Sequence, residues 1–175
     1  MKTFKEMSEE ERSSKRNEVI EEHLPYEFFM LLNNFLMLQE STTSKKYHDS
    51  ILESFCIHMR ILINFFIEKN HSDDINASDY IQDYKAKNDF KGSFWYNNRI
   101  RANKSVGHMT YQRTTDIEEK TWEIAKITEG LTNEIMHFTE SLDGEYKNLM
   151  NKSQNYQEFL HLKNSAYKAG LLTQQ

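Results

Sequence analysis

Five side chains that can bind phosphate or exchange a proton gather within fifteen residues, RIRANKSVGHMTYQR. They are Arg99, Arg101, Lys104, His108 and Arg113. A guanidinium is planar, always charged and suited to phosphate oxygens, whereas an imidazole titrates near neutral pH and can transfer protons. This stretch is therefore either a site that handles phosphates or a solvated basic face of the molecule.

The distribution of charge separates this region from the rest of the chain. Residues 85–113 carry seven Lys and Arg side chains against one acidic residue, Asp89, which gives a local net charge of +6. The whole chain has a net charge of −5, so the remaining residues contribute −11. A local excess of this kind can mark an anion-binding surface, although the overall charge favours neither nucleic acid nor an anionic membrane.

Arg101 and His108 are the pair whose spacing allows joint chemistry. On an unbroken helix, residues seven positions apart lie within roughly 20° of one face and about 10 Å apart along the axis. They are then too far apart to hydrogen-bond to each other, but both can contact one ligand. The competing interpretation is a structural histidine and a surface arginine.

The sequence gives no indication of a metal centre or a cofactor. Cys56 is the only cysteine, so neither an intramolecular disulfide nor a thiolate cluster can form, and we expect a small buried hydrophobic residue. Glu134 and His137 have the Glu-x-x-His spacing of di-metal helical bundles, but such a site requires two copies of that motif. We therefore expect no metal ligands and no cofactor.

Composition predicts an all-α protein. The 175 residues include one proline and five glycines, which leaves few turn-forming residues, and this length fits a single domain. We expect a bundle of about five helices. A charged lead-in or N-terminal helix covers 1–24, the bundle covers 25–142, and a helical tail covers 143–175.

Apolar periodicity locates the helices that must position the basic segment. The stretch YEFFMLLNNFLMLQE is apolar on most sides of a helix, which is typical of the centre of a bundle, and Pro25 suits its first turn. Residues 47–69 predict a strongly amphipathic helix with an apolar arc of about 160°. The basic segment is expected to be helical over 94–106, and Thr115-x-x-Glu118 predicts the start of a long helix ending near residue 142.

Two segments together resemble a known family. LESFCIHMRILINFF (52–66) is similar to a helix of small bacterial HEPN proteins, the higher eukaryotes and prokaryotes nucleotide-binding class, with its acidic-Ser-Phe start, central Arg and Leu-x-x-Phe-Phe end. NKSVGHMTYQR (103–113) resembles the segment that those proteins carry downstream. Ribonucleases of the family contain Arg-x(4–6)-His, and here six residues separate Arg101 from His108.

The resemblance implies a HEPN-like helical bundle that binds RNA and, in active members, cleaves it without a metal ion. His108 would then transfer protons at the 2′-OH and the leaving oxygen, and Arg101 would stabilise the charge of the phosphorane. The resemblance also implies a homodimer with its site at the dimer cleft. A toxin or phage-defence role follows from it as well, with a nucleotidyltransferase-type antitoxin as partner.

Four further residues of this segment are candidate substrate contacts, each with a structural alternative. Asn103 and Lys104 could position an RNA backbone, or simply be polar residues on a helix surface. Tyr111 could stack on a base or close the bundle. Arg113 could contact a phosphate or pair with Glu118.

Other conspicuous residues near these segments are expected to be structural. Phe94, Trp95 and Tyr96 are interpreted as core and loop packing rather than as a platform for bases. Arg60 falls at the edge of the apolar arc of its helix, where we expect a charge-paired structural role.

Two functions of other classes remain open. One is a catalytically inactive helical module that dimerises or docks a partner, which would bury His108 and expose an apolar surface elsewhere. The other is a nucleotide-sensing domain that binds without cleaving. The charged N-terminus lacks the apolar core of a signal peptide, and no apolar run approaches about 20 residues, so we expect a cytoplasmic protein without a membrane segment.

Overall fold

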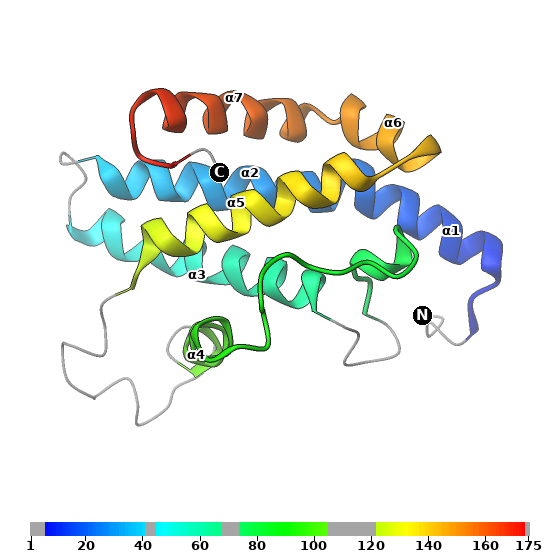
Figure 1. Ribbon diagram of the computed structural model, residues 1–175, viewed down its shortest axis with the longest axis horizontal. Coiled ribbons are helices and arrows are strands. Elements are labelled where there is room, and N and C mark those ends of the chain that lie inside the picture. The colour runs from blue at the N-terminus through cyan, green and yellow to red at the C-terminus, as the bar shows by residue number, and fades with distance from the viewer. Residues whose placement is uncertain (1–5, 41–44, 68–73, 105–121, 174–175) are drawn as a thin grey trace.

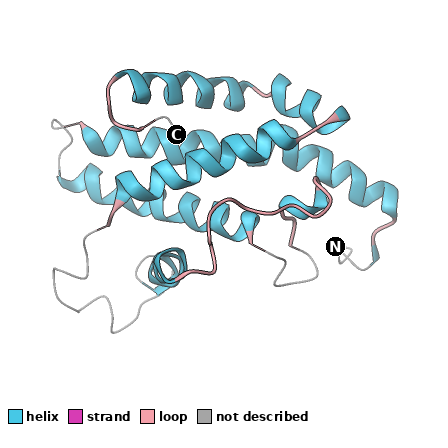
Figure 2. Cartoon of the chain, in the orientation of Figure 1, coloured by secondary structure: helices cyan, strands magenta, loops and turns pink. Residues whose placement is uncertain are grey.

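Helices make up the regular structure of the computed structural model (Figure 1), and Figure 2 shows them joined by loops. The structure describes residues 6–40, 45–67, 74–104 and 122–173, and these contain no strand, which confirms the predicted all-α class. The elements in chain order are α1 (Glu9–Glu18), the π-helix η2 (Val19–His23), α2 (Leu24–Gln39), α3 (Lys45–Phe66), the 3₁₀ helix η3 (Ala77–Asp79), α4 (Ser93–Ala102), α5 (Ile124–Ser141), α6 (Gly144–Lys152) and α7 (Gln154–Lys168).

The first three elements form one continuous helical rod. In η2 the Leu24 N–H bonds to the carbonyl of Val19, five residues earlier. Pro25 follows in the first turn of α2, and its ring would clash with the carbonyl four residues back in a regular α-helix. The wider π-helical turn relieves this clash. Pro25 therefore marks a change of helix type, and the described residues contain six helical rods where about five were expected.

α2 occupies the centre of the bundle, as its apolar sequence predicted. It contacts α3, α5 and α7, and Figure 1 shows α7 over the side of α2 that faces away from α3. The side chains of Phe28, Leu31, Leu32 and Phe35 are at most 1% exposed. Burial of this helix on several sides explains why it lacks a polar face.

The amphipathic helix predicted over 47–69 is confirmed as α3, which ends at Phe66. Its buried side chains recur at helical spacing and face α2 and α5. They include Phe55, Cys56, Met59, Leu62, Ile63 and Phe66.

The long helix predicted from Thr115 begins later, as α5 at Ile124. Thr115 and Glu118 lie outside the described residues, but Trp122 and Glu123 are described and are not helical. Glu123 has ψ 58°, so the helix starts only after it. The apolar spacing that buries Ile127 and Leu131 begins there. The packing of these side chains, rather than a capping signal, therefore fixes the start of α5.

α4 lies across the bundle and packs on α3; Figure 1 shows it end-on. Gly130 of α5 permits this arrangement, since a Cβ there would lie 2.6 Å from Cζ2 of Trp95 in α4. At the other end of the chain, extended backbone at Ser153 divides the predicted tail helix into α6 and α7. Within the described ranges, no helix combines the length and the apolar character needed to cross a bilayer.

Candidate functional site

The contact between α3 and α4 brings together the two segments singled out in the sequence. Nη1 of Arg60, in the middle of α3, donates a hydrogen bond of 2.7 Å to Oδ1 of Asn103, the C-cap of α4. One turn later in α3 and one turn earlier in α4, Nη1 of Arg99 donates to Oδ1 of Asn64 at 3.4 Å. Arg60 therefore has an amide partner on another helix, where the sequence had predicted a charged one.

Arg101 lies over an aromatic ring on the same end of α4. Its guanidinium carbon is 4.1 Å from the ring centroid of Trp122, which immediately precedes α5, and both side chains are half-buried. Arg101 also interacts electrostatically with Cys56 of α3. Burial raises the pKa of the Cys56 thiol to about 12, and the positive charge of Arg101 partly opposes that rise. The guanidinium is thus held against the ring that precedes α5.

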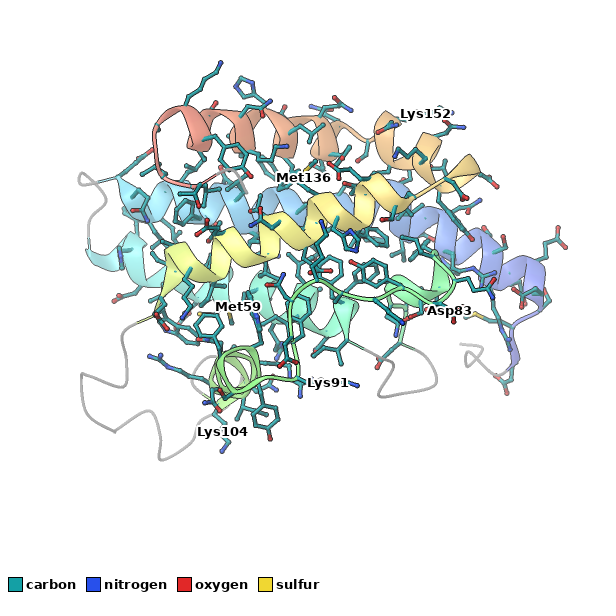
Figure 3. The ribbon with its side chains drawn as sticks, viewed as in Figure 1. Met59, Asp83, Lys91, Lys104, Met136 and Lys152 are labelled. Atoms are coloured by element: carbon teal, nitrogen blue, oxygen red, sulfur yellow. The ribbon has the colours of Figure 1, made fainter. Side chains whose placement is uncertain are left out.

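The predicted site residues fall into two groups. Arg101, Asn103 and Lys104 lie together at the C-terminal end of α4, where Lys104 is exposed and extends away from the bundle (Figure 3). His108, Tyr111 and Arg113 lie outside the described residues. Arg99, one of the five basic residues singled out in the sequence, also belongs to this surface, as does Arg60, for which the sequence had predicted only a structural role.

The aromatic residues of α4 differ in their surroundings. Trp95 is 7% exposed and packs against Phe90, which confirms a packing role, and Nζ of Lys126 lies 4.1 Å from the centre of the Phe94 ring. Tyr96 is 49% exposed, with the Arg99 guanidinium 5.7 Å from its ring centre. Tyr96 is therefore a surface residue beside a cation rather than part of the core.

A cavity of about 530 Å³ opens beside the Arg99–Asn64 contact. Four stretches of chain supply its walls: η2 with the start of α2, the C-terminal half of α3, residues 74–75, and α4. Its polar lining consists of His23, Glu27, Asn64, Asp74, Arg99 and Asn103. Sequence patterns could not reveal this cavity, because each wall contributes only two to four residues.

Glu27, in the wall of this cavity, lies within hydrogen-bond distance of the buried side chain of His58. Its Oε2 lies 2.6 Å from Nδ1 of His58, and the side chains of Glu27 and His58 are 16% and 10% exposed. The ring of Tyr26 meets the imidazole edge-on at 5.7 Å. His58 thereby fixes the position of one carboxylate in the cavity wall.

The Glu-x-x-His pair of α5 has a different use. Glu134 is completely buried and accepts hydrogen bonds from the loop that precedes α4, and Nε2 of His137 lies 3.3 Å from the carbonyl oxygen of Lys85. Within the described part of the chain, no three His, Cys, Asp or Glu side chains are grouped as metal ligands. In this protein the Glu-x-x-His pair therefore anchors the loop that precedes α4.

Two features thus define the site: a cationic surface, formed by Arg60, Arg99, Arg101 and Lys104, and the cavity next to it.

Comparison with protein-family models, with curated proteins and with solved structures finds no match to this chain.

Proposed function

We propose that this protein is a HEPN-like RNA-binding protein that cleaves RNA without a metal ion, using Arg101 and His108. The observation that carries the proposal is the 2.7 Å hydrogen bond from Arg60 to Asn103. These two residues come from the two segments that resemble HEPN proteins, and they are 43 positions apart in the sequence. The contact supports the idea that both segments serve one site.

The cationic surface suits the backbone of a nucleic acid. Four cations from two helices lie around the α3–α4 contact, and Lys104 is exposed at its edge. Lys and Arg side chains that neutralise phosphates provide the sequence-independent part of the affinity for RNA. Arg101 approaches Trp122 with its guanidinium carbon over the ring, and a cation held in this way loses little further freedom when it binds a phosphate.

The proposed reaction is an internal displacement within RNA. A general base removes the 2′-OH proton, the 2′-oxygen attacks phosphorus, and the bond from phosphorus to the 5′-oxygen breaks as that oxygen accepts a proton. A cyclic phosphate and a free 5′-OH remain. His108 would carry the protons, since an imidazole titrates near the working pH, and Arg101 would balance the charge on the non-bridging oxygens.

A second function rests on a separate observation. Two neighbouring helices, α2 and α3, expose large apolar side chains, namely Tyr26, Met37, Tyr47 and Ile57, which are 43%, 38%, 66% and 42% exposed. A partner that covers these side chains would remove their apolar surface from water. The alternative proposal is therefore a catalytically inactive module that dimerises or docks a partner. A homodimer and an antitoxin of the nucleotidyltransferase type remain proposals that rest on the resemblance to HEPN proteins.

Cleavage of mixed single-stranded RNA in EDTA tests the proposed function. The wild type is expected to release fragments with cyclic-phosphate ends, and Arg101→Ala and His108→Ala are each expected to abolish their release. His161→Ala, an exposed histidine on α7, is the matched control and should cleave as the wild type does. Absence of cleavage by a folded wild type would reject the ribonuclease and favour the binding module.

A further inference from the structure

The cavity beside α4 has the size and composition of a small-molecule site. Its volume of about 530 Å³ lies within the range of ligand pockets, and such pockets combine mostly apolar walls with a few fixed polar groups. The apolar walls here include Leu24, Ile61 and Ile100. The π-helix η2 forms part of the rim, and π-helical turns are frequent at functional sites. The elements that enclose it can be followed in Figure 1.

One wall of the cavity offers a fixed hydrogen-bond acceptor. Glu27 reaches this wall with a side chain that is only 16% exposed, and its Oε2 is held by His58. Among the described residues, Oε1 of Glu27 makes no hydrogen bond. A carboxylate that is already positioned and already partly desolvated can accept from a ligand with little further cost.

The α4 side of the cavity offers fixed donors. Arg99 is steadied by Asn64 and by the ring of Tyr96, and its guanidinium carries five N–H groups. Asn103 has its Oδ1 engaged by Arg60, so its Nδ2 group is turned to the opposite side of the amide. Arg99 and Asn103 both line the cavity, as does Glu27.

This combination of groups selects a particular ligand chemistry. An anionic ligand would meet the carboxylates of Glu27 and Asp74, and a cationic one would meet Arg99. A neutral planar ligand with donors on one edge and acceptors on another satisfies both walls. Its faces would contact the apolar residues.

We propose that this cavity binds a guanine base. Guanine presents two donors, N1–H and the N2 amino group, to the carboxylate of Glu27. It presents two acceptors, O6 and N7, to the donors of Arg99 and Asn103, which is the pairing that arginine makes with guanine in nucleic-acid recognition. Adenine has no N1–H, so it would leave the carboxylate without its second donor.

The proposal does not depend on RNA cleavage. A guanine base can come from a free nucleotide or from an RNA strand that lies on the cationic surface, and the chemistry in the cavity is the same. The two sources are separated by measuring GMP against short single-stranded RNA with and without one guanine. Binding by GMP alone indicates a free nucleotide, and guanine-dependent binding of the RNA alone indicates a base of the strand.

Equilibrium binding by titration calorimetry tests the site. We expect the wild type to bind GMP, or the guanine-containing RNA, at least about tenfold more tightly than the adenine equivalent, because a hydrogen bond to a charged group is lost. Inosine monophosphate, which keeps N1–H and lacks the amino group, should fall between the two.

Two pairs of variants locate the binding. Ile61→Trp fills the cavity and should abolish guanine binding, whereas Ile57→Trp places the same side chain on the exposed face of α3, one turn earlier, and should not. Arg99→Gln replaces the charged, forked guanidinium by a shorter neutral amide without changing the core and should weaken binding at least about tenfold, whereas Lys91→Gln, exposed before α4, should not. Arg99→Gln decides the question if Ile61→Trp does not fold.

Three results would overturn the proposal that the cavity binds guanine. Equal binding of guanine and adenine probes, equal binding by Arg99→Gln and Lys91→Gln, or no binding of either guanine probe at millimolar concentration would each do so. RNA cleavage and guanine binding are measured separately on the wild type. A wild type that cleaves RNA but binds no guanine probe overturns this proposal alone, whereas one that binds the guanine probe without cleaving RNA overturns only the proposed function.

Discussion

The buried carboxylate of Glu134 accepts a hydrogen bond of 2.6 Å from the hydroxyl of Tyr84. It also accepts from the backbone N–H groups of Lys87 and Asn88, at 3.1 and 2.9 Å, and from Nδ2 of Asn88 at 2.8 Å. Burial, with the adjacent carboxylate, raises the pKa of Tyr84. One side chain of α5 thus fastens the loop before α4, and through it the helix that carries the cationic surface.

Replacing this anchor is expected to destabilise the protein. Glu134→Gln puts an amide N–H₂ against backbone donors and leaves at least one of them unsatisfied, at a cost on the order of 3 kcal/mol in the free energy of unfolding. Glu140→Gln, an exposed position on the same helix, should change that free energy by less than about 0.5 kcal/mol. Urea unfolding of the two variants measures the difference, and equal midpoints would contradict the anchoring role.

Gly130→Ala is expected to destabilise the protein, although the same substitution usually stabilises a helix interior. Glycine to alanine normally stabilises a helix interior by about 0.5–1 kcal/mol, because alanine restricts the unfolded chain. Here the new Cβ would lie 2.6 Å and 2.8 Å from two atoms of the buried Trp95 ring. We expect Gly130→Ala to lower the melting temperature, with a shift in tryptophan fluorescence. The smaller ring of Trp95→Phe should reduce the penalty in the double variant, and a rise in melting temperature for Gly130→Ala would disprove the close packing.

The stability of the fold is expected to fall at alkaline pH, in part through Cys56. Burial raises the pKa of its thiol to about 12, with the charge of Arg101 opposing and that of Glu53 adding to the rise. The unfolded chain releases this proton near pH 8.5, so the contribution is fully present below that pH and is lost as pH rises toward 12. At pH 10 the loss is roughly 2 kcal/mol. Urea unfolding of wild type and Cys56→Ala at pH 7.5 and 10 should show a shallower pH dependence for the variant, and parallel dependences would exclude Cys56 as the source.

Trp122 is expected to contribute to RNA binding through Arg101. Removing the ring in Trp122→Ala frees the guanidinium that lies 4.1 Å from the centre of that ring and should weaken RNA binding about threefold to tenfold. Trp122→Phe retains an aromatic face and should lose less. A double-mutant cycle with Arg101→Ala, read by fluorescence anisotropy of labelled single-stranded RNA, separates this coupling from simple loss of packing. Additive effects would show that the two side chains act independently.

Much of the architecture followed from the sequence, because apolar spacing is a local property. The pattern over 47–69 predicted α3, and side chains of its apolar arc, such as Phe55 and Met59, are buried. The apolar stretch after Pro25 predicted a central helix, which is α2. The start of α5 was predicted less well, since capping signals are weak beside the packing that fixes where a helix begins.

The candidate site could likewise be predicted from the sequence only in part. The sequence determined which residue types gather at the end of α4, where Arg101, Asn103 and Lys104 lie. Only the tertiary structure decided that Asn103 is the partner of Arg60 and that Arg99 and Glu27 line a common cavity. These pairings depend on how helices cross and how each is rotated about its axis. Local periodicity specifies the buried face of a helix, but the long-range packing of many side chains specifies what that helix meets.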